Sequence, residues 1–359
     1  MIQIKIPVDL RKIIEISDEI YTFIEIMNQI DLMKYVEIKE SNIGRPRFDV
    51  IKLLKIILFA FMEEGCASTR RIEKLCKTDV RYIWILDGMK APSHMTIDNF
   101  INNCLKKNID EIFAEINTYI FEKENVDLGH IYIDGTKIEA NANKYTFVWN
   151  KSVKNYDKKL DEKIKNHLRE IDRVVAEENR IYLDEDLEEL GENNRITSEQ
   201  VEAVVESIDA RLAETPDNKE LKKKAKEFKK DILPRKKKYE EALHTFEGRN
   251  SYSKTDHDAT FMRMKEDAML NGQLKPGYNV QIGTENRYIV GYTIHPNPTD
   301  TKTMIPHLNH LKEKLGTLPE NIITDSGYGS EENYEYLEEN HLGSYVKYNK
   351  FHWEKKKKN

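Results

Sequence analysis

The chain has 359 residues, of which 39% are hydrophobic and 33% charged, and its formal net charge is −6. This length predicts two or three folding units, the composition excludes a disordered chain, and the net negative charge by itself argues against a nucleic-acid partner. The three cysteines form no CxxC pair, which argues against a disulfide framework or a cysteine zinc site. The longest apolar run, residues 56–62, is far shorter than the roughly 20 residues of a membrane span. We therefore expect a cytoplasmic protein without an export signal or membrane contact.

The first part of the chain shows a helical pattern. An apolar stripe between Ile13 and Met27 recurs near the helical period. The turn Gly44–Asp49 is expected to cap the next helix, because Asp is a favoured N-cap residue. The expected helices lie within residues 1–40 and at 50–63, 68–77, 80–86 and 96–122.

Residues 45–81 are basic, with a net charge of +4. The helix at 68–77 follows Gly65 and fits the second helix of a helix-turn-helix, which would offer Arg70, Arg71 and Lys74 to DNA. The solvated face of an ordinary helical bundle carries the same charges. Both interpretations stay open on these residues alone.

Residues 151–250 have a different composition, with 25 acidic and 23 basic side chains. Such a stretch is predicted not to fill a compact core by itself and to form a helical hairpin or coiled-coil insertion. Its charge is polarised: residues 177–217 carry −11 and residues 219–238 carry +8. Antiparallel pairing of these two arms would neutralise both, and the net charge of the whole chain mainly describes the acidic arm.

Strand patterns occupy the remaining sequence. A short apolar strand at 130–134 ends in Asp134, and a second one at 321–325 ends in Asp325. Between and after them we expect a hairpin of strands 278–283 and 288–295, helices at 300–315 and 330–339, and a last strand at 344–349. Without the insertion, the expected order is strand, strand, strand, helix, strand, helix, strand.

Two aspartates at strand ends are the informative feature of this pattern. A right-handed crossover through the helix at 300–315 can place the second acid strand beside the first and parallel to it. Asp134 and Asp325 would then lie side by side, which is unfavourable for two carboxylates unless a cation lies between them. Oxygen ligands predict Mg²⁺ or Mn²⁺. Two such ions can activate a hydroxyl and stabilise the leaving oxygen in an in-line attack on a phosphodiester.

Other side chains near the first acid have two possible roles. Lys137 and Lys144 can contact a scissile phosphate or be ordinary surface lysines. Asp256 and Asp258 are expected to order a turn, with an outer metal ligand as the alternative. Trp149 is expected to be a buried anchor of the insertion, with stacking on a flipped base as the alternative.

Five separated motifs, in this order, resemble bacterial insertion-sequence transposases of the DDE type. The N-terminal motifs are Gly44–Asp49 with Ser68–Glu73, which resemble the helical domain of those enzymes. The others are Ile133–Trp149, Arg249–Met262, Gly277–Gln281 and Asp325–Tyr328. The order of elements is similar to a ribonuclease H-like core.

The resemblance implies a mixed α/β or α+β protein in three parts. Residues 1–124 would form a helical DNA-binding domain. The expected DNA-binding residues are five in this domain, Arg45, Arg47, Arg70, Arg71 and Lys74, and two after it, Lys137 and Lys144. Residues 125–150 and 251–359 would form the ribonuclease H-like mixed-sheet core, which the insertion 151–250 interrupts. The implied partners are terminal inverted repeats and target DNA, bound by a nucleoid-associated homodimer.

The resemblance also implies a catalytic triad whose first two acids, Asp134 and Asp325, hold two Mg²⁺ or Mn²⁺ ions. The third acid would be a glutamate on a helix behind the last strand, and only ten residues follow position 349. Four glutamates on the helix after Asp325 (Glu331, Glu332, Glu335 and Glu338) and Glu354 are formal substitutes, the first four being expected surface residues. We therefore expect a truncated transposase with impaired cleavage and strand transfer, or alternatively an inactive DNA-binding fragment that inhibits transposition.

Overall fold

The computed structural model describes residues 9–36, 48–176, 195–264 and 272–348. The chain divides into two compact units. One contains residues 1–132, 284–291 and 309–322, and the other contains residues 133–283, 292–308 and 323–359. No helix in the described ranges is long and apolar enough to cross a membrane.

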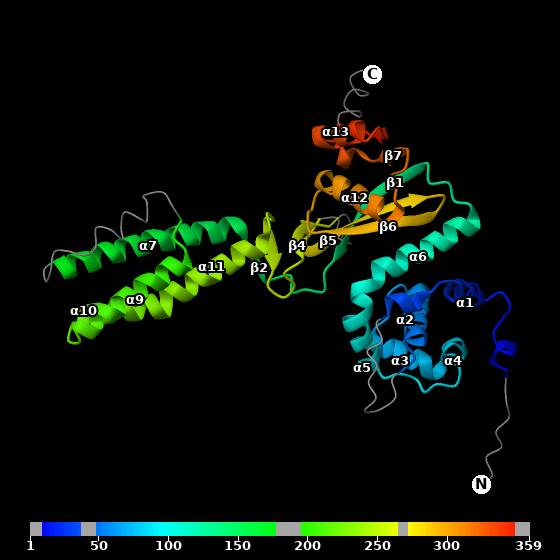
Figure 1. The fold of residues 1–359 in the computed structure, drawn as a ribbon, viewed down its shortest axis with the longest axis horizontal. Helices are drawn as coiled ribbons and strands as arrows, with labels where there is room; N and C mark the ends of the chain where they lie inside the picture. The colour runs from blue at the N-terminus through cyan, green and yellow to red at the C-terminus, as the bar shows by residue number, and fades with distance from the viewer. Residues whose placement is uncertain (1–8, 37–47, 177–194, 265–271, 349–359) are drawn as a thin grey trace, which may run out of the picture. The chain divides into compact units, whose positions relative to one another are not determined.

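A bundle of helices forms the N-terminal part of the first unit (Figure 1). Its members are η1 (Leu10–Lys12), α1 (Ile20–Gln29), η2 (Leu32–Tyr35), α2 (Val50–Glu64), α3 (Thr69–Thr78), α4 (Val80–Leu86), α5 (His94–Phe100), η3 (Ile101–Leu105) and α6 (Lys106–Glu124). Their apolar faces meet in one core that includes Ile20, Leu54, Phe59, Ile72 and Tyr82. The bundle thus buries the stripe from Ile20 to Met27, whereas Ile13 and Ile16 at its start are exposed.

Capping residues set where these helices begin, as their sequence predicts. Asp49 accepts hydrogen bonds from the amides of Ile51 and Lys52 at the start of α2, and Ser68 accepts one from Arg71 N at the start of α3. The predicted helix at 96–122 is confirmed as an uninterrupted helical segment over 94–124, in which the π-helical turn η3 joins α5 to α6. Spacing of apolar residues does not reveal one extra residue in a turn.

Helix α6 also contacts strand residues of the same unit. Asn117 on α6 is buried, and its side-chain amide donates to the carbonyls of Ile289 and Val290, at 3.0 and 3.2 Å. The ring of Phe121 packs against that of Tyr288 with the centroids 6.2 Å apart. A buried amide with two acceptors fixes this helix more specifically than apolar contact alone, because an unpaired amide would be costly.

A six-stranded mixed sheet forms the second architectural element. Its strands are β1 (His130–Glu139), β4 (Thr260–Arg263), β5 (Leu274–Glu285), β6 (Tyr288–His295), β7 (Asn321–Thr324) and β8 (Gly343–Val346). Their order is β4-β5-β1-β7-β8, and β6 pairs with β5. A separate pair joins β2 (Phe147–Trp149) to β3 (Ser251–Ser253) in antiparallel register, Phe147 opposite Ser253.

The connections between the last strands follow the predicted pattern. They are η5 (Asp300–Lys302), α12 (Met304–Leu315), η6 (Ser326–Tyr328) and α13 (Glu331–Glu339). The expected hairpin is confirmed as β5 and β6, and β7 lies next to β1 as the crossover argument predicts. Strands β2, β3 and β4 were not predicted, because three or four residues are too few to show a period.

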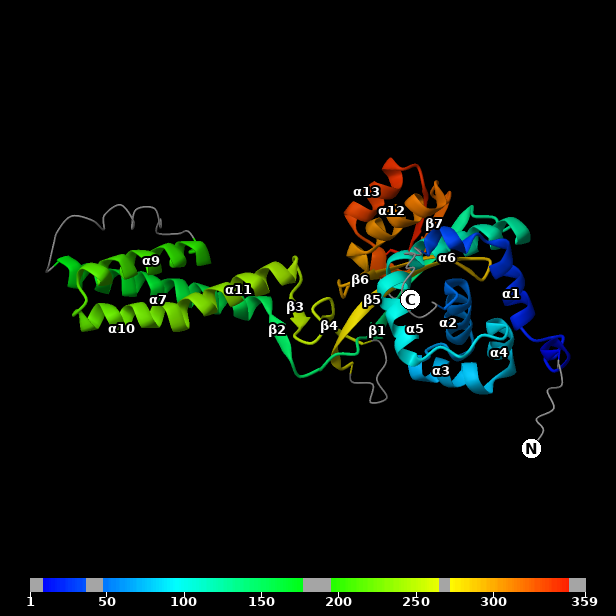
Figure 2. The same ribbon diagram turned by 60° about the horizontal axis from the view of Figure 1, so that its bottom comes forward.

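The described part of the charged insertion is helical and contains α7 (Asn150–Ala176), α9 (Ser198–Glu214), α10 (Lys219–Glu227) and α11 (Leu233–Phe246), the last two joined by the π-helical turn η4 (Phe228–Ile232). They lie side by side in both views (Figures 1 and 2). Pairing between the two arms is confirmed in part: Asp209 on α9 forms an ion pair of 2.7 Å with Lys229, while other lysines of the basic arm, such as Lys224 and Lys236, pair with acids of α7. Residues 177–194 of that arm lie outside the described residues.

The prediction that this insertion lacks a compact core is wrong. Leu160, Ile164, Leu168 and Ile171 recur along α7 at helical spacing and are buried. They share one apolar cluster with Val201 and Val205 of α9 and with Leu221, Phe228 and Ile232 of the α10–η4 segment. A narrow apolar stripe on each of three packed helices is enough to form a core. The sequence does not show this directly, because charged residues on the outer faces far outnumber the apolar residues of the stripe.

One carboxylate in the N-terminal bundle gives a testable pH dependence. Glu73 on α3 accepts hydrogen bonds from Lys77 and from the backbone and ring of His94, and these lower its pKa from 4.5 to about 2. A lowered folded-state pKa contributes stability that is present above pH 4.5 and lost as the pH falls through about 2. The difference in unfolding free energy between the wild type and Glu73→Gln should therefore be largest above pH 4.5 and disappear by about pH 2. Denaturant unfolding at a series of pH values measures it, and a difference independent of pH would contradict the assignment.

Candidate active site

Asp134 lies on β1, and Asp325 directly follows the neighbouring strand β7; the two strands begin together. Strand β7 is adjacent to β1, and Asn321 N donates to Gly129 O at 3.0 Å where both strands start. The strands therefore run in the same direction. Asp134 follows the start of β1 by four residues and Asp325 follows the start of β7 by four, so the two aspartates occupy equivalent levels.

The side chains of both aspartates are also expected on the same, exposed face of the sheet. Ile131 and Ile133 of β1 are buried and alternate with exposed Tyr132 and Asp134. In β7 the buried residues alternate in the same phase, which leaves Asp325 exposed. Side chains of parallel neighbours at equal level and parity share one face of a sheet. The arrangement brings the two predicted carboxylates to one exposed face.

Asp134 differs from its prediction in one respect. We expected β1 to end at Asp134, but the strand continues to Glu139. The residue after the acid, Gly135, is buried within the strand. The Asp-Gly pair therefore does not mark a turn here. Gly135 instead allows close approach, because a Cβ at this position would lie 2.6 Å from Oδ1 of Asp300 and 2.7 Å from Nε2 of Gln281.

Asp325 ends its strand and organises the turn that follows. Its Oδ1 accepts a hydrogen bond of 2.8 Å from Gly327 N, which starts the single turn η6. Tyr328 closes this turn and is fully buried. Its hydroxyl donates to Oε1 of Gln281 on β5. The turn that carries Asp325 is thus fastened to a strand on the other side of β1.

A third aspartate, which the sequence did not single out, lies in the same neighbourhood. Asp300 was expected to start the helix at 300–315, and its carboxylate is not used as a helix cap. Instead Oδ1 accepts from the side-chain amides of Asn279 at 2.8 Å and Gln281 at 3.2 Å. Asn279 and Gln281 are fully buried. Two amides spaced by two residues in an apolar strand were the signal in the sequence that could have indicated this contact.

The three aspartates act together on one buried hydroxyl. Burial raises the pKa of Tyr328 above its ordinary range, and the negative charges of Asp300, Asp134 and Asp325 raise that pKa further. The phenol therefore stays neutral and remains a hydrogen-bond donor.

The donor set fits a hard divalent cation in part. Asp134 and Asp325 supply carboxylate oxygens on one exposed face, which are the ligands that Mg²⁺ and Mn²⁺ prefer. Within the described residues, however, no group of three or more His, Cys, Asp and Glu side chains stands close enough together to hold a metal ion. The pair therefore forms one side of a possible cation site.

The glutamates considered as substitutes for a third acid are surface residues where the structure describes them. Four of them are on α13, and all four are exposed: Glu331, Glu332, Glu335 and Glu338. The expectation that they are surface residues is confirmed. Glu354 lies outside the described residues.

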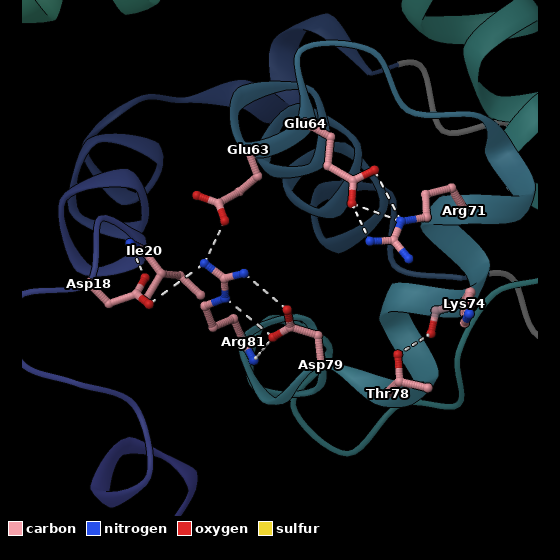
Figure 3. Close-up of polar contacts among 9 residues, drawn as sticks. All are labelled: Asp18, Ile20, Glu63, Glu64, Arg71, Lys74, Thr78, Asp79 and Arg81. Atoms are coloured by element: carbon pink, nitrogen blue, oxygen red, sulfur yellow. Dashed lines mark hydrogen bonds and ion pairs between the residues drawn. The ribbon is translucent and has the colours of Figure 1, made fainter.

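The predicted DNA-contacting side chains of α3 differ in their contacts. Arg70, Arg71 and Lys74 are all exposed. Arg71 is engaged within the bundle, because its guanidinium forms an ion pair of 2.6 Å with Glu64, as Figure 3 shows. The side chain of Lys74 points away from this pair in the same view, while its carbonyl accepts a hydrogen bond from Thr78. Arg70 and Lys74 are therefore better placed than Arg71 for a phosphate.

Arg81, the last basic residue of the segment 45–81, has a structural role. Its guanidinium contacts Glu63 at 2.6 Å, Asp79 at 3.0 Å and Asp18 at 3.7 Å (Figure 3). These contacts join α2, α4 and the segment before α1. The positive charge of this segment thus overstates how many of its cations can reach DNA.

The remaining predicted DNA-binding residues fall in three places. Lys137 on β1 donates to the carbonyl of Arg263 at 3.0 Å. Lys144 is exposed and lies 5.3 Å from the ring centroid of Tyr145. Arg45 and Arg47 lie outside the described residues. The structure thus engages Lys137 within the protein and leaves Lys144 on the surface.

Asp256 and Asp258 order a turn between β3 and β4, as expected. Asp256 accepts from Asp258 N at 3.3 Å and from the hydroxyl of Tyr278 at 2.6 Å. Arg249 is buried and donates to the carbonyls of His257 and Asp258, each at 2.9 Å.

Trp149 is half-buried, and its ring lies near those of Phe147 and Phe261. It sits where α7 leaves the β2–β3 pair, in agreement with an anchoring role.

Comparison with known families identifies both ends of the chain. Residues 249–359 match the family described as Transposase DDE domain, and residues 8–103 match the family described as Transposase domain (DUF772). No curated protein and no solved structure matches the chain. Asp300 and Asp325 fall within the first match, helices α1–α5 fall within the second, and Asp134 lies between the two. The chain belongs to the insertion-sequence transposase family.

Proposed function

We propose that this transposase binds the ends of its insertion sequence and catalyses metal-dependent cleavage and strand transfer with Asp134 and Asp325 as its first two catalytic acids. The observation that carries the proposal is the placement of these residues at equivalent levels and on the same exposed face of neighbouring strands. The DDE-domain match supports the reaction class, because DDE transposases act through divalent metal ions.

In the proposed reaction the protein supplies ligands and orientation. Asp134 and Asp325 would hold Mg²⁺ or Mn²⁺ through their carboxylates. The bound metal supplies activation of a hydroxyl nucleophile and stabilisation of the leaving oxygen. The bond from Gly327 N to Asp325 Oδ1 orients that carboxylate, and the buried contact of Tyr328 with Gln281 holds the turn. Rigid support of this kind lowers the reorganisation needed when substrate binds.

The sheet order supports a ribonuclease H-like core. Starting from β6, the neighbouring strands are β5, β1, β7 and β8, so the first strand of the core lies in the centre and the hairpin lies on one side of it. With this core we propose the three-part organisation of residues 1–124, of 125–150 with 251–359, and of 151–250. Binding in this organisation would involve the helical region for the element ends and a homodimer in the DNA complex.

Helix α3 is the proposed DNA-contacting element, and its three cations should contribute unequally. We expect the double substitution of Arg70 and Lys74 by alanine to weaken binding to the element ends and to lower the salt dependence by about one to two released counterions. Arg71→Ala should have a smaller effect on binding, because its guanidinium is already paired with Glu64. Binding curves at several salt concentrations, with Arg11→Ala as an exposed control outside α3, measure both effects. Equal losses for all variants would contradict the assignment to α3.

Cleavage of end-containing DNA tests the proposed function. The probe is a linear fragment with the two ends of the encoding insertion sequence, incubated with the protein in Mg²⁺, in Mn²⁺ or in EDTA. Cleavage at the ends in metal and none in EDTA is the expected result. Specific binding without cleavage would overturn the catalytic proposal and would favour the alternative of a DNA-binding protein that occupies element ends.

A further inference from the structure

Asp300 occupies the space between the two segments that carry the proposed catalytic acids. A Cβ on Gly135, the residue after Asp134, would lie 2.6 Å from Oδ1 of Asp300. A Cβ on Gly327, two residues after Asp325, would lie 3.3 Å from Oδ2 of the same carboxylate. One oxygen of Asp300 therefore faces the first acid's strand and the other faces the second acid's turn.

Buried amides hold this carboxylate in one orientation. Oδ1 accepts from Asn279 and Gln281, both with no exposed surface. Gln281 is itself oriented, because its Nε2 also donates to Oδ1 of Asn279 at 3.1 Å and its Oε1 accepts from the Tyr328 hydroxyl. A carboxylate with two fixed donors on one oxygen cannot rotate without leaving buried amides unpaired, which is costly.

The backbone beside Asp300 is tied to the turn of the second acid. The hydroxyl of Thr301 donates to Gly327 O at 3.0 Å. Asn333 on α13, also buried, donates to the carbonyls of Thr301 at 2.9 Å and Tyr328 at 2.6 Å. Hydrogen bonds thus connect η5 to η6 from both sides of the turn, and each of them involves a residue next to Asp300 or within the turn.

We propose that Asp300 is a positioning residue that aligns Asp134 and Asp325 with each other for metal binding. This inference rests on the proposed function, since it assigns a role at the same site. Asp300 acts through the Gln281–Tyr328 contact and through the turn 325–328. The alignment requires the acceptor oxygens of its side chain and does not require its negative charge. Partners that orient metal ligands commonly change metal affinity by about 10- to 100-fold when they are removed.

Two measurements on the full chain test the proposal: Mn²⁺ affinity, and hydrogen exchange of the backbone amides of residues 325–329. Asp300→Ala should weaken Mn²⁺ binding about 10- to 100-fold and speed exchange in this turn. Asp300→Asn keeps an acceptor oxygen for the two amides, so it should restore most of the affinity and protection. Thr301→Val removes the bond to Gly327 O with little change of shape and should show an intermediate loss in both measurements. Glu313→Gln, an exposed acid on α12, is the matched control.

The outcomes separate this inference from the proposed function. If Asp300→Ala and Thr301→Val both behave like Glu313→Gln, Asp300 does not position the acids. An Asp300→Asn variant as impaired as Asp300→Ala would also overturn the inference, because the effect would then depend on charge. If Asp134→Asn binds Mn²⁺ as tightly as the wild type, the proposed function fails at this site. The exchange of residues 325–329 still decides the role of Asp300 in that case, because it requires no metal.

Discussion

Asp134→Asn and Asp325→Asn should each lower the rate of metal-dependent cleavage at the element ends by at least about 10²–10³-fold. The reason is electrostatic: both carboxylates lie on the exposed face where β1 and β7 meet, and an amide cannot replace the charge that holds a divalent cation. Cleavage of the end-containing fragment under single-turnover conditions measures the loss. Asparagine preserves the side-chain volume, so little change in folding is expected.

Two comparisons make this result specific. Glu332→Gln removes an exposed carboxylate from α13, close in sequence to Asp325, and should leave the cleavage rate nearly unchanged. DNA binding by both aspartate variants, measured in EDTA, should equal that of the wild type, because the proposed DNA-contacting residues lie on α3. Wild-type cleavage by either aspartate variant would remove that residue from the proposed site.

Lys236→Met should destabilise the helical insertion by about 3–5 kcal/mol, since it leaves the buried Asp161 carboxylate without its cation and Asp157 with Arg195 alone. Lys236 has no exposed surface, and its Nζ lies 2.7 Å from Asp157 and 2.5 Å from Asp161. Burial raises the pKa of Asp161 even with this lysine present, which indicates how costly that carboxylate would be alone. Hydrogen exchange of amides in α7 and α11 reports the free energy of opening this region.

The neighbouring lysine provides a matched control for this prediction. Lys237 pairs with Glu202, and both side chains are about half exposed. Because exposed ion pairs contribute little, Lys237→Met should change stability by less than about 1 kcal/mol. Replacing Lys236, Asp157 and Asp161 together by Met, Leu and Leu should recover most of the lost stability, because no buried charge then remains. Equal effects of the two single substitutions would contradict the account.

Several features of the catalytic region could be predicted from local sequence. The apolar runs before Asp134 and Asp325, the hairpin and the helix between β6 and β7 all appear near their expected positions. Such elements follow from residue spacing, which depends on neighbours in the chain. The length of β1 could not be predicted in this way, because residues 135–139 are held in the sheet by contacts with β5: Ala140 N, which follows the strand, donates to Pro276 O.

The helical insertion shows the opposite case. Its helices and the pairing of opposite charges were predicted. Its apolar core was not, because the average composition of residues 151–250 does not reveal a narrow stripe of apolar residues along each helix. Only the packed helices show that Leu160 and Ile164 meet Phe228 and Ile232. Likewise, Lys236 is one of many lysines in the sequence, and its burial between two aspartates depends on how α11 packs on α7.

The sequence by itself determined the family of this protein and the two strand-borne aspartates, because its motifs and strand patterns are local. The tertiary structure decided which side chains surround those aspartates. Asp300, Asn279 and Tyr328 lie far apart along the chain or in different elements, and they meet through Gln281 only when β5, η5 and η6 are brought together. Hydrogen bonds between residues distant in sequence arise from strand order and close approach at Gly135, and neither is encoded in the spacing of neighbouring residues.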